Sequence, residues 1–268
     1  MYNFEYQKAT DAQTAVTALK THPDAKYLGG GQSLLAAMKL RLAQPSTLVD
    51  VTRIPGMKGI RTQPGVVTVG AATCHADVAE SADIARMLPA LAELAGGIGD
   101  RQVRAMGTLG GSLANNDPAA CYPAAVLGLN ATIVTERRNI AADDFFLGMY
   151  ETALAPDELI TEVQFPVPDQ AAYVKFRNPA SRFALVGVFV SRKGNHVRVA
   201  VTGAAPCVFR CAPLEQALSA TFTSEAARHV TVSADELVGD LHASPEYRAA
   251  LIPVLAARAV EHALAKHH

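Results

Sequence analysis

The stretch whose residue types point most directly to chemistry is Gly29-Gly30-Gly31-Gln32-Ser33-Leu34. A glycine backbone carries no Cβ and reaches positive φ readily, so its N–H groups can closely approach a negatively charged ligand. Apolar residues at helical spacing predict a helix over residues 32–42, which would place the glycines at a helix N-terminus, a favourable position for phosphate. A tight strand-to-helix turn that binds no ligand explains the same glycines equally well.

A second glycine-rich stretch runs through residues 107–118 and contains Thr108, Gly110-Gly111-Ser112, Asn115 and Asp117. We interpret it as a second loop, and two such loops suggest one ligand with two ends, such as a dinucleotide. Neither stretch matches the G-x-G-x-x-G pattern of a Rossmann site, and no lysine follows the glycines as in a P-loop.

Composition excludes several classes of function. The 268 residues carry a formal net charge of −1 with no basic block, which argues against a nucleic-acid partner. No apolar run approaches membrane-spanning length and no signal peptide is apparent, so we expect a cytoplasmic protein. Cys207 and Cys211 are interpreted as ordinary thiols rather than metal ligands, because no second pair has matching spacing. We predict no metal site and no catalytic residue in this chain.

The pattern of elements predicts an α+β fold. Short strands and helices alternate up to a linker at residues 166–168, with one helix expected over residues 77–95. Beyond the linker, three consecutive strands are followed by helices, the last running from Pro245 towards Lys266. We therefore predict a domain over residues 1–166, with subdomains of about 1–55 and 56–166, and a second domain over 167–268 built on a three-stranded antiparallel sheet.

Four motifs in this order resemble the FAD-binding medium subunit of molybdenum hydroxylases, the family of aerobic carbon monoxide dehydrogenase and xanthine dehydrogenase. The first glycine stretch is similar to that family's first flavin loop, usually written A-G-G-x-S-L, and the run Gln102-Val103-Arg104 with Gly107 to Gly111 is similar to its second. The segments at residues 173–177 and 183–186 resemble the opening of the family's C-terminal domain. The resemblance covers essentially the whole chain, and it implies a PCMH-type FAD domain of two α/β subdomains followed by a smaller α+β domain.

The resemblance also implies which residues contact FAD. Amides of residues 29–33 would hold the pyrophosphate, opposite a wall formed by the second stretch. Apolar and polar contacts to the rings would complete the site, which gives the full set Leu28, Gly29, Gly30, Gly31, Gln32, Ser33, Leu34, Ile98, Thr108, Gly110, Gly111, Ser112, Asn115, Asp117, Cys121, Ile160, Lys175 and Phe183. Lys175 would lie near the polar edge of the flavin, where a cation stabilises negative charge.

Several of these residues have a simpler interpretation that stays open. Cys121 stands where family members commonly have an Asp that accepts hydrogen bonds from FAD hydroxyls, and a thiol is a poor acceptor. Asp117 can form a turn without touching a ligand, Lys175 can be a solvated strand lysine, and Ile160 and Phe183 can be core residues. His75 is interpreted as a helix-start histidine rather than an acid–base group.

By the same resemblance, the chain is an oxidoreductase subunit that transfers electrons through FAD. Electrons would come from two 2Fe–2S clusters of a small subunit, after substrate oxidation at a molybdenum cofactor on a large subunit, in a heterotrimer or a dimer of heterotrimers. The substrate and the final acceptor (oxygen, quinone or NAD) cannot be read from this chain. Two alternatives are a stand-alone flavoenzyme acting on a small molecule and a flavin-binding protein without electron transfer.

Overall fold

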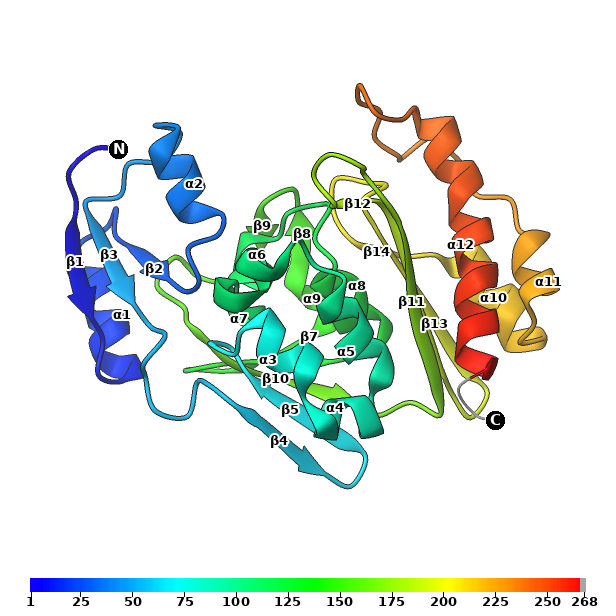
Figure 1. Ribbon diagram of the computed structural model, residues 1–268, viewed down its shortest axis with the longest axis horizontal. Helices are drawn as coiled ribbons and strands as arrows, with labels where there is room; N and C mark the ends of the chain where they lie inside the picture. The colour runs from blue at the N-terminus through cyan, green and yellow to red at the C-terminus, as the bar shows by residue number, and fades with distance from the viewer. Residues whose placement is uncertain (266–268) are drawn as a thin grey trace.

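The computed structural model describes residues 1–265 and contains three larger sheets that follow one another along the chain (Figure 1). The first sheet is parallel, in the order β1-β3-β2, and is accompanied by two helices. Its elements are β1 (Glu5–Lys8), α1 (Ala12–Thr21), β2 (Lys26–Leu28), α2 (Leu34–Lys39) and β3 (Thr47–Asp50). Because β2 ends at Leu28, the first glycine stretch begins at the carboxyl end of a strand.

The second sheet is antiparallel, in the order β4-β5-β10-β6-β7, with β10 at its centre. Its strands are β4 (Ile60–Gln63), β5 (Val66–Gly70), β6 (Thr132–Thr135), β7 (Asn139–Ala141) and β10 (Ile160–Pro166). Seven helices and a two-stranded hairpin connect them: α3 (His75–Glu80), α4 (Ala82–Met87), α5 (Pro89–Gly96), α6 (Arg101–Met106), α7 (Leu109–Asn115), α8 (Tyr122–Gly128), α9 (Ala142–Phe145), β8 (Phe146–Gly148) and β9 (Glu151–Thr152).

The third sheet is antiparallel, and helices cover one of its faces (Figure 1). It consists of β11 (Gln170–Arg177), β12 (Ala184–Lys193), β13 (His196–Thr202) and β14 (Phe209–Arg210), followed by α10 (Ala212–Ala220), α11 (Ser224–Arg228) and α12 (Pro245–Ala265). Buried residues of α12, among them Ile252, Leu255 and Val260, share a core with valines of β12 and β13. The first two sheets contribute to a separate, larger core.

Three expectations from the sequence are corrected. The third sheet has a fourth strand, β14, where three were predicted. The helix predicted over residues 77–95 is three helices, because Ser81 and Leu88 adopt non-helical backbone angles and cap the segments between them. The helix predicted over residues 32–42 is only α2, and Leu40 and Leu42 beyond it are exposed. Lys266, the predicted end of the last helix, lies outside the described residues.

The second glycine stretch is also corrected, since most of it is helix α7 rather than a loop. Thr108 caps this helix by accepting a hydrogen bond from the Gly111 N–H at 3.2 Å. Gly110 lies against the end of β5, where a Cβ would come within 2.7 Å of the Ala71 Cβ. Glycine is therefore tolerated in this helix because it allows the close approach to the sheet. Among the described residues, no helix is both long and apolar enough to cross a membrane.

Candidate functional site

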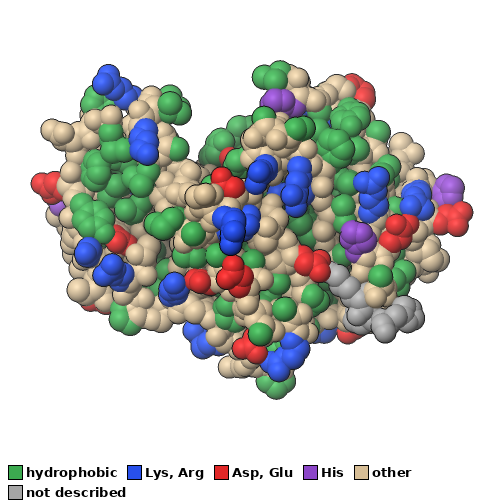
Figure 2. Space-filling model, in the orientation of Figure 1, with side chains coloured by type: hydrophobic (Ala, Val, Ile, Leu, Met, Phe, Trp, Pro, Cys, Tyr) green, Lys and Arg blue, Asp and Glu red, His purple; other side chains and the backbone are tan. Residues whose placement is uncertain are grey.

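A cavity of about 840 Å³ lies between the first glycine stretch, α7, the start of β10 and the loop at residues 178–183. On the surface, Figure 2 shows the molecule hollowed between the α2 region and its centre. This volume is near the upper end of the roughly 300–1,000 Å³ that is usual for small-molecule sites. All of the site residues predicted from the sequence line this cavity: Leu28, Gly29, Gly30, Gly31, Gln32, Ser33, Leu34, Ile98, Thr108, Gly110, Gly111, Ser112, Asn115, Asp117, Cys121, Ile160, Lys175 and Phe183.

The two glycine stretches touch each other at one wall of the cavity. A Cβ on Gly30 would lie 1.9 Å from the carbonyl oxygen of Met106 and 2.7 Å from the Gly107 Cα. A Cβ on Gly29 would lie 2.8 Å from the Thr108 Oγ1. Since real Cβ atoms do not come this close to backbone atoms, glycine at position 30 is required for the contact between the two stretches.

The backbone of the first stretch presents free donors. Within residues 1–265, none of the amide N–H groups of residues 29–33 donates a hydrogen bond, although the Gly31 carbonyl accepts one from Leu35. Unpaired backbone N–H groups cost free energy unless water or a ligand accepts their hydrogen bonds. A row of such donors at the edge of a cavity suits an anionic group such as phosphate.

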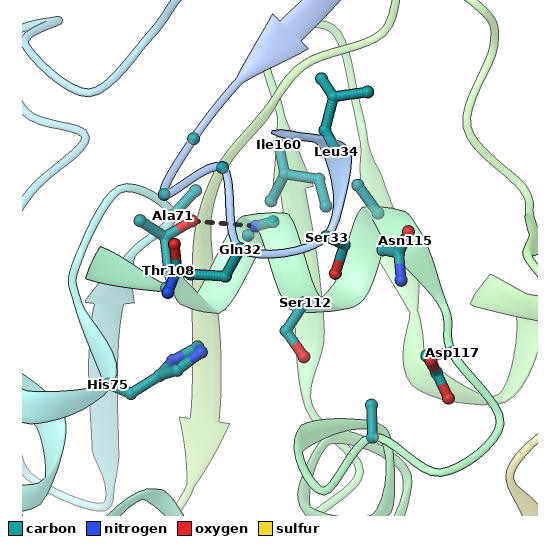
Figure 3. A pocket seen from close by; sticks show the side chains of 18 of the residues that line it. Gln32, Ser33, Leu34, Ala71, His75, Thr108, Ser112, Asn115, Asp117 and Ile160 are labelled. Atoms are coloured by element: carbon teal, nitrogen blue, oxygen red, sulfur yellow. Dashed lines mark hydrogen bonds between the residues drawn. The ribbon is translucent and has the colours of Figure 1, made fainter. Parts of the chain in front are cut away.

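Polar side chains of α7 face this row across the cavity. Figure 3 shows Ser112 and Asn115 projecting from α7 on the side where Gln32 and Ser33 lie. The helix is held against β5 by the Gly110 N–H, which donates to the Ala71 carbonyl at 2.8 Å. Hydroxyl and amide groups therefore approach the same space from both sides.

Lys175 enters the cavity from β11 and makes only weak or neutral contacts. Its Nζ donates to the Cys121 Sγ at 3.3 Å and to the Arg182 carbonyl at 3.1 Å. It forms no ion pair with a carboxylate in the described part of the chain. Cys121 is only 5% exposed, so the thiol fills the wall beneath the ammonium group. Among residues 1–265, the positive charge of Lys175 is thus left without an anionic partner.

Asp117 has both a local role and a place on the cavity wall. Its Oδ1 accepts a hydrogen bond from the Ala119 N–H at 2.8 Å, the turn expected for its sequence context. Its Oδ2 accepts one from the Tyr150 hydroxyl at 3.4 Å. Tyr150 also lines the cavity, and sequence reasoning missed it because it sits between the two short strands of the β8–β9 hairpin.

The apolar members of the predicted site differ in exposure. Ile160, the first residue of β10, is 4% exposed and belongs to the larger core as well as to the cavity wall. Phe183 is 49% exposed, so it is not a core residue. Ile98 lies in the turn after α5 at another part of the wall.

His75 is a second residue of the wall that sequence reasoning did not select. It is the first residue of α3, as expected for a helix-start histidine, but its side chain lines the cavity. Burial, and secondarily the charge of Arg104, lowers the pKa of His75 from 6.5 to about 4. In the sequence, the only indication was that His75 stands between a predicted strand and a predicted helix. That indication does not show that His75 lines the cavity, because the packing of α3 near α6 is not visible in the sequence.

Comparison with known proteins assigns the family. The model of the FAD-binding domain in molybdopterin dehydrogenase matches residues 2–168. The chain belongs to this family. It is 37% identical to the carbon monoxide dehydrogenase medium chain of Hydrogenophaga pseudoflava, with 98% of each chain covered. It is 35% identical to the nicotine 6-hydroxylase medium subunit of Paenarthrobacter nicotinovorans, with 97% of each covered.

Solved structures agree with the sequence comparison. A chain of the carbon monoxide dehydrogenase from Hydrogenophaga pseudoflava superimposes with a TM-score of 0.87 at 34% identity, covering 99% of this chain and 98% of that one. Membership of the FAD-binding family makes FAD the cofactor and places the chain among the subunits of oxidoreductase complexes.

The cavity observed in this member of the FAD-binding family fits its cofactor. The free amides of residues 29–33 supply donors for a pyrophosphate, and the Gly30 contact leaves no Cβ in their way. The opposite wall offers the Ser112 hydroxyl and the Asn115 amide, while Lys175 brings an uncompensated positive charge. The hydrogen-bond donors, the positive charge and the volume of the cavity are therefore those that a dinucleotide with two negative charges requires.

Proposed function

We propose that this chain is the FAD-carrying medium subunit of a molybdenum-containing hydroxylase or dehydrogenase. In this role it receives electrons from 2Fe–2S clusters of a partner subunit and passes them to an external acceptor. The observation that carries the proposal is the row of free amides at residues 29–33, which opens on the cavity opposite α7. The similarity to medium chains over nearly the whole length supports the same role.

Each group of cavity residues has a proposed task. The amides of residues 29–33 hold the pyrophosphate, and the α7 wall (Thr108, Gly110, Gly111, Ser112 and Asn115) faces it. FAD, when bound, supplies the chemistry of accepting and releasing electrons, while the protein supplies position and electrostatics. Leu28, Ile160 and Phe183 exclude water as apolar walls. Lys175 provides a positive charge that favours a more negatively charged cofactor.

We further propose the division of the chain into an FAD-binding domain over residues 1–166, with subdomains of about 1–55 and 56–166, and a C-terminal domain over 167–268. The three sheets support it, since their strands lie within residues 5–50, 60–166 and 170–210. The loop at residues 178–183, which lines the cavity, brings the C-terminal domain to the site.

The proposed partners are an iron–sulphur small subunit and a molybdenum-cofactor large subunit, in a heterotrimer or a dimer of heterotrimers in the cytoplasm. A surface for them lies at the segment before β1 and at the segment that follows α2, where hydrophobic side chains gather on the face seen in Figure 2. We call it the α2 patch and define it by five exposed residues: Met1, Tyr2, Phe4, Leu40 and Leu42. Exposed apolar patches of this kind mark interaction sites.

Co-purification of the native complex tests the proposal. The expected result is one assembly that contains FAD, molybdenum and iron, with the FAD lost when this chain is removed. Release of FMN in place of FAD, or purification of this chain as a stand-alone enzyme that oxidises a small molecule, would contradict it.

A further inference from the structure

His75 lies beside the point where the two glycine stretches meet. It is 5% exposed, and its ring packs against Tyr122 with the ring centroids 5.2 Å apart. Figure 3 shows the imidazole extending from α3 towards Thr108 and Ser112. No group within residues 1–265 forms a hydrogen bond with either of its ring nitrogens.

The two ring nitrogens of His75 have different surroundings. Nδ1 is buried and has no hydrogen-bond partner among the described residues. Nε2 keeps accessible surface and lies next to Gly107, a cavity residue, where a Cβ would come within 2.6 Å of it. A neutral imidazole has one N–H donor and one acceptor. Because an unpaired buried N–H group is especially unfavourable, we expect the proton on Nε2, where it is directed at the cavity.

The electrostatic surroundings favour an anionic partner for this donor. Burial lowers the pKa of His75, and the charge of Arg104 lowers it further, so the ring is neutral at neutral pH. The Arg104 guanidinium is fixed by donating to the Ile98 carbonyl at 2.9 Å. A positive charge therefore acts on the free N–H donor.

We infer that His75 is a cofactor-binding residue that donates a hydrogen bond from Nε2 to the pyrophosphate of FAD. The inference rests on the proposed function, because it takes FAD as the ligand. The part of FAD that His75 contacts is inferred from where His75 lies. Gly107 lies next to His75 and also next to Gly30, whose neighbouring amides are free. The imidazole donor and the amides of residues 29–33 thus face one region, where phosphate oxygens can accept from both.

Two substitutions separate a donor from a packing residue. His75→Met removes the donor and replaces the imidazole with an apolar side chain of similar size. His75→Gln keeps an N–H donor. Apoproteins are titrated with FAD and, separately, with ADP, which carries the pyrophosphate without the flavin. We expect His75→Met to weaken both ligands by on the order of 10- to 100-fold, the worth of one hydrogen bond to a charged group. His75→Gln should retain most of the affinity.

Thermal unfolding of the same apoproteins provides the readout that a structural role would not reproduce. His75→Met should unfold at the same or a higher temperature than the wild type, because it no longer buries an unpaired Nδ1. A packing role would instead lower stability and affinity together. His229→Met is the matched control, because the side chain of His229 is 78% exposed. It should change neither the affinity for FAD and ADP nor the unfolding temperature.

The outcomes distinguish this inference from the proposed function. Wild-type affinity of a stable His75→Met protein for both ligands would overturn the inference and leave the FAD role intact. Failure of the wild type to bind FAD would instead remove the proposed function. If His75→Met does not fold, wild-type protein with nitrogen-15-labelled histidine decides the matter. The Nε2 resonance of His75 should shift when ADP is added, and an unchanged resonance would refute the contact.

Discussion

Cys121 lies beside Lys175, with the Lys175 Nζ 3.3 Å from the Cys121 Sγ. A substitution at Cys121 therefore changes the group that the Lys175 ammonium contacts. Cys121→Asp is expected to tighten FAD binding by about tenfold or more, because a charge-assisted hydrogen bond to a cofactor hydroxyl is worth roughly 1.5–3 kcal/mol. Lys175 offsets the cost of placing a carboxylate in a buried position. Titration of the apoprotein with FAD measures the change.

Cys121→Ser is the control for this substitution, since it keeps the size of the side chain without adding charge. It should leave the affinity for FAD close to that of the wild type. If Cys121→Asp binds FAD no more tightly than the serine variant, Cys121 is only a packing residue beneath Lys175.

The buried imidazole of His75 makes the stability of the apoprotein depend on pH. Its pKa is lowered from 6.5 to about 4 in the folded state, so the unfolded chain takes up a proton first as the pH falls. The folded state should therefore lose about 3 kcal/mol of its free energy of unfolding between pH 6.5 and pH 4, since a difference of one in pKa corresponds to about 1.36 kcal/mol. Well above pH 6.5, where the imidazole is neutral in both states, this contribution is constant.

Urea unfolding at several pH values, compared between the wild type and His75→Met, isolates this effect. The difference in free energy of unfolding between the two proteins should grow as the pH falls from 6.5 towards 4. Parallel pH profiles for the two proteins would show that His75 is not buried as a neutral group.

The contact between the first glycine stretch and the end of α6 depends on Gly30. Gly30→Ala places a Cβ 1.9 Å from the Met106 carbonyl oxygen, so one of the two segments must move. We expect loss of FAD binding by at least an order of magnitude, because the free amides would no longer face α7. Equilibrium dialysis with FAD measures it, and circular dichroism checks that the variant is folded.

Gly96→Ala is the matched control, since its Cβ would meet only the Ala79 Cβ, at 3.8 Å. Gly96 lies within α5, where alanine is favoured over glycine by roughly 0.5–1 kcal/mol. This variant should bind FAD normally and be slightly more stable. Equal FAD affinity of Gly30→Ala and Gly96→Ala would show that the two stretches do not need to touch.

At the level of elements, the sequence predicted the general order of strands and helices but not every element. The three consecutive strands expected beyond the linker correspond to β11, β12 and β13, because the signals for strands are local. Helix α7 was missed because Gly110 and Gly111 have low helix propensity, and the packing of Gly110 on Ala71 that compensates is a tertiary contact. The breaks between α3, α4 and α5 depend on backbone angles at single residues, which periodicity does not show.

The cavity lining was predicted at the positions given by the glycine motifs and the family resemblance, and it was missed at other positions. The residues taken from the motifs all reach the cavity, but their contacts with FAD stay a prediction. His75 and Tyr150 come from segments without a motif, and only the packing of α3 and of the β8–β9 hairpin brings them to the wall. The Cys121–Lys175 contact joins residues 54 positions apart, a separation that local pattern cannot reveal.

For the whole molecule, the α2 patch predicts how the complex assembles. Leu40 and Leu42 are 71% and 79% exposed, so each can bury most of an apolar side chain against a partner. The double variant Leu40→Asp with Leu42→Asp should weaken association with the partner subunits by at least tenfold, since each buried leucine contributes about 1.5–3 kcal/mol. Size-exclusion chromatography of the reconstituted complex measures association.

Leu241→Asp is the control for this surface, because Leu241 is 91% exposed and lies outside the patch. It should leave assembly unchanged, and both variants should bind FAD as the wild type does. Normal assembly of the double variant would exclude the α2 patch as the partner surface without affecting the role of the cavity.

The central claim is that this chain carries FAD for electrons that arrive through partner subunits. Anaerobic stopped-flow reduction of its bound FAD tests that claim most directly, with carbon monoxide, an aldehyde, a purine or an N-heterocycle as reductant. The isolated chain should stay oxidised with every one of these and be reduced by dithionite, while the complete complex is reduced by its own substrate. Reduction of the lone chain by one of these substrates, at a normal enzyme rate of about 1–1,000 per second, would contradict the claim and identify a stand-alone flavoenzyme.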